Sequence, residues 1–108
     1  GEAYVYHKNQ PGDYGDSFAF PANFRFPTET PVQVRIAVTM NAVGKRDGSL
    51  RVWINDKLMV KRSDMEWRTV DSYGVDGLYF ETFHGGGDAS WAPTHACWAE
   101  FAAMKVGR

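Results

Sequence analysis

The chain has 108 residues, which suits a single domain over residues 1–108 and is too short for a second one. Apolar residues make up 44% and charged residues 23%, a composition that argues against disorder. The net charge of −1 argues against nucleic acid as the main partner, because phosphate binding needs a concentrated basic face. No apolar run approaches the roughly 20 residues that span a bilayer, so we expect no membrane partner.

Aromatic residues make up 15% of the chain, and 11 glycines and 5 prolines punctuate it at short intervals. This mixture favours strands and turns over helices. Cys97 is the single cysteine, so no internal disulfide can form. A buried packing role is our first expectation for Cys97, and a disulfide partner outside this chain is the alternative.

The N-terminal residues predict a short strand over Ala3–His7. Tyr4 and Tyr6 are two positions apart, so on a strand both rings project from the same face, whereas His7 projects from the other. The phenylalanines between Phe18 and Phe26 then punctuate a loop or an irregular strand.

The middle of the chain predicts a three-stranded meander. Apolar and polar residues alternate over Val32–Met40, as expected for a half-buried strand. A polar turn over 41–48 leads to a second alternating segment, Ser49–Ile54, and Asn55–Lys57 turns the chain into Leu58–Lys61.

The last third contains two further candidate strands. Gly77–Phe83 is rich in aromatic and β-branched residues and is followed by a flexible glycine-rich loop, His84–Asp88. Ala96–Val106 suits either a helix or a strand, and the all-β context favours a strand. Six or seven strands, with turns roughly every 8–12 residues, predict an antiparallel all-β sandwich. It is either a small complete sandwich or one end of a larger one.

The densest group of reactive side chains lies at Tyr4, Tyr6, His7 and Lys8. Two tyrosines on one strand face are either ordinary cross-strand packing or a surface for sugar binding and proton transfer. A phenol has an ordinary pKa near 10, so it acts as a base near neutrality only where cations stabilise the phenolate.

Arg35, Arg51, Lys61 and Arg68 lie in or near predicted strands, together with Trp53. If some of these cations share a face, they could pair with carboxylates of a substrate, and an arginine could do so with two parallel hydrogen bonds. The indole of Trp53 offers a flat apolar surface for a sugar. The alternatives are a solvated sheet face and a buried tryptophan.

Other signatures of enzyme sites are missing from the sequence. The loop His84–Asp88 lacks the Lys-Ser/Thr of a phosphate-binding loop, and no serine lies in a Gly-x-Ser-x-Gly elbow. His7, His84 and His95 do not have zinc-ligand spacing. We therefore predict no cofactor and leave a structural cation open.

The order of several short motifs resembles the alginate and glucuronan lyases of polysaccharide lyase family 14. The resemblance covers nearly the whole chain, and each motif is weak alone. The matching stretches are Tyr4–His7 with Gln10, Gly15-Asp16, Met40-Asn41 with Gly44, Asp47-Gly48, Val52–Asp56, Tyr79–Gly86, and Asp88 with Trp91–Pro93.

The resemblance implies a jelly-roll sandwich, of which this chain would be the C-terminal portion, in a secreted enzyme. It implies cleavage of uronic-acid polymers by β-elimination, with Tyr6 as acid/base and Tyr4 as helper. We assign substrate binding to six side chains: His7, Lys8, Gln10, Arg35, Arg51 and Trp53. Two stretches depart from the family pattern, Trp98–Phe101 in place of an aromatic-Asp-Asn run and Asn55-Asp56 where Asp-Gly is common.

Three functions remain open from the sequence. We favour the lyase, acting on an acidic polysaccharide, over a non-catalytic carbohydrate-binding relative and over a structural or assembly protein. A partial sandwich would expose strand edges and an apolar face, so we expect it to pair with a second copy or with a complementing N-terminal chain.

Overall fold

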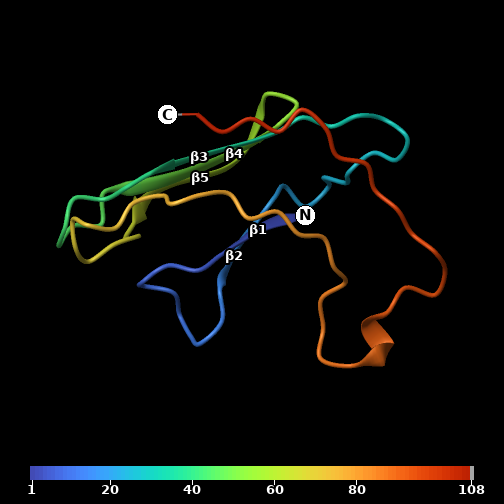
Figure 1. Ribbon diagram of the computed structural model, residues 1–108, viewed down its shortest axis with the longest axis horizontal. Helices are drawn as coiled ribbons and strands as arrows, with labels where there is room; N and C mark the ends of the chain where they lie inside the picture. The colour runs from blue at the N-terminus through green and yellow to red at the C-terminus, as the bar shows by residue number, and fades with distance from the viewer. Residues whose placement is uncertain (108) are drawn as a thin grey trace. The chain divides into compact units, whose positions relative to one another are not determined.

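The computed structural model describes residues 1–107, which form two compact units (Figure 1). Unit 1 is Gly1–Val75, and unit 2 begins at Asp76. Each unit is described by itself. Within residues 1–107 no helix is long and apolar enough to cross a membrane.

Unit 1 contains two antiparallel sheets. The strands are β1 Glu2–Val5, β2 Asp16–Ala19, β3 Val34–Thr39, β4 Gly48–Ile54 and β5 Lys57–Met65. In the smaller sheet, β1 pairs with β2, and Ala3 lies opposite Phe18. The larger sheet has the order β3-β4-β5, with Arg35 opposite Trp53 and Arg51 opposite Lys61. The prediction of an antiparallel all-β fold is confirmed, while the jelly-roll strand order stays a prediction.

Every second side chain of β4 is buried and contributes to the core between the two sheets. Leu50, Val52 and Ile54 are buried, whereas Arg51 between them is exposed. These three side chains form one cluster with Val60 and Met65 of β5 and with Phe18 and Phe20, which lie on or just after β2. The hydrophobic effect therefore holds the β1-β2 pair against the inner face of the larger sheet.

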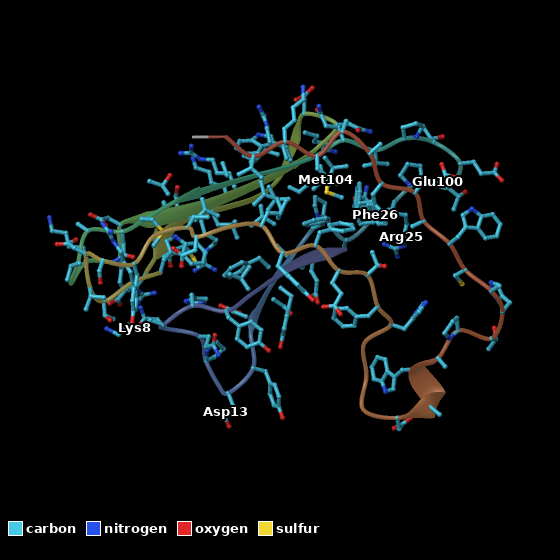
Figure 2. The ribbon with its side chains drawn as sticks, in the orientation of Figure 1. Lys8, Asp13, Arg25, Phe26, Glu100 and Met104 are labelled. Carbon is cyan, nitrogen blue, oxygen red and sulfur yellow. The ribbon has the colours of Figure 1, made fainter. Side chains whose placement is uncertain are left out.

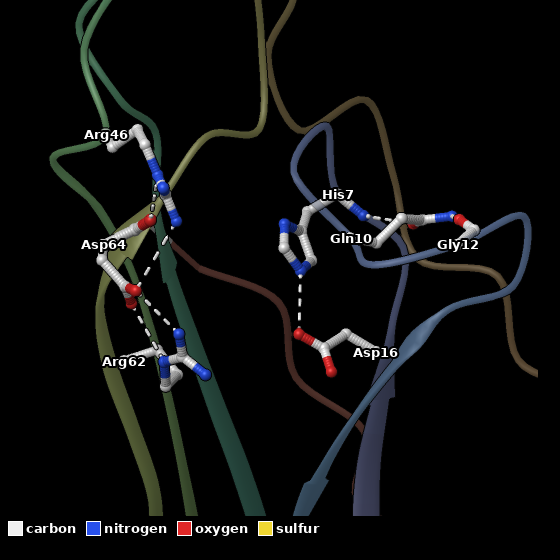
Figure 3. Close-up of polar contacts among 7 residues, drawn as sticks. All are labelled: His7, Gln10, Gly12, Asp16, Arg46, Arg62 and Asp64. Carbon is white, nitrogen blue, oxygen red and sulfur yellow. Dashed lines mark hydrogen bonds and ion pairs between the residues drawn. The ribbon is translucent and has the colours of Figure 1, made fainter.

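Arg62 contacts both an aromatic ring of this core and a neighbouring carboxylate. Its guanidinium lies 4.5 Å from the ring centroid of Phe18 and donates two hydrogen bonds to Asp64, at 2.9 and 2.7 Å. Arg46 approaches the same carboxylate at 3.8 Å (Figure 3). The bidentate contact orients Arg62 so that its charge is balanced while its flat side chain covers an aromatic ring.

The Asn41–Gly48 segment, part of the motif set, has a structural role. The side-chain oxygen of Asn41 accepts from the backbone N–H groups of Trp67 and Arg68, at 2.8 and 3.0 Å. A Cβ on Gly48 would lie 2.8 Å from the carbonyl oxygen of Met65, so only glycine fits there without a shift. Asn41 is fully buried, and its bonds satisfy backbone groups that would otherwise be left unpaired at the end of β5.

A two-residue turn joins β4 to β5. Asn55 and Asp56 both have positive φ, 46° and 62°, as the common tight hairpin turn requires. Asn55 also exchanges two hydrogen bonds with Gln33, through its backbone N–H and its side-chain oxygen, at 2.9 and 2.8 Å. The predicted turn is therefore confirmed, and asparagine and aspartate tolerate the left-handed backbone that glycine usually supplies.

β3 is one of the two edge strands of the larger sheet. Val34, Ile36 and Val38 lie opposite the core residues of β4, and therefore on the inner face, yet all three are exposed. The predicted strand over Val32–Met40 is confirmed at Val34–Thr39, and the last predicted strand of the meander extends beyond Lys61 to Met65.

Unit 2 forms no strand in the residues that the structure describes. Its single regular element is the 3₁₀ turn η1, Ala89–Trp91, with the Asp88 side chain accepting from the N–H of Ser90. The predictions of strands over Gly77–Phe83 and Ala96–Val106 are therefore wrong for this structure. A strand is stabilised by ladder hydrogen bonds and a covered face, and the described residues from Asp76 onward are all exposed and unpaired.

Candidate functional site

The tyrosine pair lies on the outer face of the smaller sheet. Tyr4 alternates with Ala3 and Val5, which pack against the core, so its ring points away from the core. Tyr6 follows directly after β1. The two ring centroids are 5.6 Å apart in an edge-to-face arrangement, and the residues are 51% and 62% exposed. The pair is thus a defined aromatic surface that solvent reaches.

Gly15 makes room for this pair. A Cβ at Gly15 would lie 2.9 Å from the Tyr4 ring, so the backbone approaches the phenol closely. Partial burial and the neighbouring Tyr6 phenol raise the pKa of Tyr4 above its ordinary value. Tyr4 therefore keeps its proton at neutral pH, and its hydroxyl can donate a hydrogen bond.

His7 projects inward, opposite to the tyrosines, with 4% of its side chain exposed. Its Nε2 lies 3.4 Å from an Asp16 oxygen (Figure 3). Its ring stacks on Phe18 with 6.2 Å between centroids. Its buried Nδ1 has no hydrogen-bond partner among the described residues. In this position His7 packs beneath the tyrosine pair, and its assignment to substrate binding stays a prediction.

The loop after β1 carries Lys8 (Figure 2), whose ammonium donates to Glu66 at 2.8 Å. Asn9 donates to the other oxygen of the same carboxylate, also at 2.8 Å. The hydrogen bond from Lys8 has the largest lowering effect on the pKa of Glu66, and the hydrogen bond from Asn9 lowers it further. Lys8 is therefore already paired, and its charge anchors the loop to the end of β5.

Gln10 shapes the same loop. Its side-chain oxygen accepts from the backbone N–H of His7 at 3.0 Å, and its side-chain nitrogen donates to the carbonyl of Gly12 at 3.1 Å (Figure 3). Both ends of this amide are engaged within the protein. Of the loop residues predicted to bind substrate, Lys8 and Gln10 thus hold the backbone that follows the tyrosine pair.

Arg35, Arg51 and Trp53 lie elsewhere in unit 1. They alternate with the buried residues of β4 and their partners on β3, so they share the outer face of the larger sheet. The Arg35 guanidinium stacks over the Trp53 ring at 4.2 Å from its centroid. The tyrosine pair and the group of Arg35, Arg51 and Trp53 therefore lie on faces that point away from one core in opposite directions, and a single small ligand cannot touch both faces.

Two features of this arrangement could not be located by sequence reasoning. Glu66 was missed because its partners, Lys8 and Asn9, are far away along the chain and no local pattern marks it. The inward position of His7 follows from strand alternation, but its contact with Asp16 depends on the register of β1 with β2.

Unit 2 contains a separate shallow hollow of about 370 Å³, lined by Thr82, Phe83, His84, Cys97, Trp98 and Ala99. Cys97 is exposed there, so the expectation that it packs in a core is wrong. Its thiol points to the carbonyl oxygen of His95 at 3.4 Å. In the part of the chain that the structure describes, no three His, Cys, Asp or Glu side chains come together in a way that could hold a metal ion.

Comparison with known families decides the identity. The model of the polysaccharide lyase 14 family matches residues 2–104. The chain belongs to this family. Searches of curated proteins and of solved structures gave no match. The resemblance inferred from the short motifs is therefore confirmed at the family level, and this polysaccharide lyase 14 match begins before the tyrosine pair and continues through most of unit 2.

Proposed function

We propose that this domain cleaves uronic-acid polymers, alginate or glucuronan, by β-elimination, as an enzyme that acts outside the cell. The observation that carries the proposal is the exposed, edge-to-face pair of Tyr4 and Tyr6 in a chain of the polysaccharide lyase 14 family. In this pair, solvent reaches two neighbouring phenol groups, so a polymer held on this sheet face could contact both of them.

The reaction needs three groups at the sugar ring. A cationic or amide group neutralises the C5 carboxylate, and this makes the C5 proton more acidic. A base removes that proton, its electron pair forms the C4–C5 double bond, and the bond from C4 to the glycosidic oxygen breaks. An acid then protonates the leaving oxygen, so one unsaturated uronate forms for each bond cleaved and no water is consumed.

The two tyrosines take different parts in this scheme. Tyr4 is neutral near pH 7 already at its ordinary pKa, and partial burial and the Tyr6 phenol raise that pKa further, so we assign Tyr4 to hydrogen bonding with the polymer. We assign proton transfer to Tyr6, which is the more exposed of the two. The ammonium of Lys8 is engaged by Glu66, so we assign it to holding the loop and not to neutralising the sugar carboxylate.

The test follows the ultraviolet absorbance of the unsaturated uronate while the protein is mixed with alginate or with glucuronan. We expect absorbance to rise with one of the polymers, and Tyr6→Phe to slow the rise by roughly 10²–10⁴-fold, the scale of a lost acid/base group. Tyr14→Phe is the matched control, because Tyr14 is exposed in the loop before β2 and makes none of the aromatic contacts of the pair.

Two results would contradict the proposal. The first is equal loss of activity in Tyr6→Phe and Tyr14→Phe. The second is a folded protein that binds both polymers and yields no unsaturated product, which would favour the non-catalytic carbohydrate-binding alternative. Circular dichroism of each variant checks that the sheets remain intact.

A further inference from the structure

The outer face of the larger sheet gathers three cations around one tryptophan. Arg35 lies opposite Trp53 across β3 and β4, and Arg51 lies opposite Lys61 across β4 and β5. Arg51 and Trp53 are two positions apart on β4 and therefore point to the same side. The register thus places all four side chains on one surface, directed away from the core.

The charges on this surface are not balanced within it. Arg51 and Lys61 are direct cross-strand neighbours, an arrangement that costs stability because like charges repel. Within residues 1–107 neither side chain forms an ion pair, and the strand positions on this face carry no carboxylate. Arg35 has only a 3.9 Å contact with Asp56 in the exposed turn, which is too weak to neutralise the face.

Trp53 holds one of these cations in a defined orientation. The central carbon of the Arg35 guanidinium lies over the indole at 4.2 Å from the ring centroid, a stacking contact that still lets its N–H groups donate hydrogen bonds. A guanidinium fixed in this way loses less side-chain entropy when it pairs with a carboxylate. The half-buried Trp53 therefore prepares Arg35 for an anionic ligand.

We propose that this face is a second binding site for the acidic polysaccharide, separate from the tyrosine pair. The choice of a uronic-acid polymer as the ligand rests on the proposed function, and the charge of the face supports it. A polymer with a carboxylate on each sugar can meet several cations at once, along a sheet whose strands lie about 4.8 Å apart. A second copy of the chain that met this face with its own equivalent face would present the same cations and be repelled.

The two sites would act together on a long polymer. Because their faces point away from one core, one stretch of sugar cannot occupy both, but two stretches of one long chain can. Binding at the cationic face then raises the effective concentration of polymer near the tyrosine pair. Short oligomers cannot gain from this, so the cationic face should affect cleavage of polymer and not of short oligomers.

The experiment compares two double variants with equal loss of charge, both in a Tyr6→Phe background that keeps the polymer intact. Arg51→Gln/Lys61→Gln alters the proposed site, and Arg25→Gln/Lys45→Gln removes one arginine and one lysine charge from exposed loop positions of unit 1. We expect the first to bind alginate or glucuronan at least about tenfold more weakly by calorimetry, the scale of lost charge-assisted hydrogen bonds, and the second to bind almost unchanged. The first should fold normally, since it relieves a like-charge contact.

Three results would overturn the inference. Equal weakening in both double variants would mean that only net charge matters. Unchanged binding in Arg51→Gln/Lys61→Gln would leave this face without a role. Binding of double-stranded DNA as tight as that of the uronan, and equally weakened by the first double variant, would make it a general polyanion surface. None of these depends on cleavage, which is measured separately by the unsaturated product, so failure of the lyase proposal is distinguishable.

Discussion

Segments with strand-like sequences form strands in unit 1 and stay irregular in unit 2. In unit 1, Val34–Thr39 pairs with β4 and forms a strand, although much of its apolar face is exposed. In unit 2, the aromatic and β-branched residues of Gly77–Phe83 also predict a strand, yet this segment stays irregular. The closest aromatic contact of unit 2, Phe80 with Phe101 at 4.7 Å between centroids, holds two segments together without a ladder.

The difference shows that pairing matters more than local preference. β4 supplies hydrogen bonds to neighbours on both sides and contributes three residues to the core. Segment Gly77–Phe83 has no such neighbour among the described residues. Strand propensity expresses a fit to a pleated, half-buried surface, so without that surface the same residues do not form a strand.

The largest expected effect comes from deleting a buried side chain in unit 1. Met65→Ala should lower the free energy of unfolding by about 2–5 kcal/mol, because Met65 is fully buried and leaves a cavity. Met104→Ala is the matched control in unit 2 (Figure 2), where Met104 is exposed, and should change stability by less than about 0.5 kcal/mol. Urea unfolding followed by tryptophan fluorescence measures both, and equal effects would contradict the contrast between the units.

A smaller contrast concerns side chains that bind backbone groups. Asn41→Ala should cost about 1–3 kcal/mol, because the N–H groups of Trp67 and Arg68 lose a buried acceptor. Asp88→Ala removes the corresponding bond to Ser90 in unit 2, where the turn is exposed, and should leave the main unfolding transition unchanged. If Asp88→Ala shifted the urea midpoint as far as Asn41→Ala, unit 2 would have to share the cooperative core.

The smallest effect is the dependence of unit 1 on acid. Lys8 and Asn9 lower the pKa of Glu66, and Arg62 lowers the pKa of Asp64. Each carboxyl group therefore has a lower pKa in the folded protein than in the unfolded chain. The two carboxylates stabilise the fold at pH values above their unfolded pKa of about 4, and this stabilisation is lost as the pH falls through their folded pKa. We expect Glu66→Gln, and likewise Lys8→Gln, to flatten the fall in Tm between about pH 5 and pH 3. A slope identical to that of the wild-type protein in both variants would exclude a role for this cluster.

These contrasts also explain which features the sequence could predict. Alternation predicted β3 and β4, and the Asn55-Asp56 pair predicted the turn that joins β4 to β5, because both signals are local. β2 was not separated from its surrounding phenylalanines, since its place depends on pairing with β1. For the site, alternation correctly separated His7 from the tyrosines. The separation of Arg35 and Trp53 from the tyrosine pair depends on how two sheets pack, and no spacing within either segment encodes that packing.

The Asn55-Asp56 turn has a consequence for ligand recognition. It is anchored to Gln33 and determines the alignment of β5 on β4. Side chains of a strand alternate, so a slip of one residue at this turn would bring Lys61 out of line with Arg51 and change which side of β5 faces water. Two residues that touch no sugar in our proposal therefore determine the chemical character of an entire surface, and a change in the length of this hairpin would be a short evolutionary route to a different specificity.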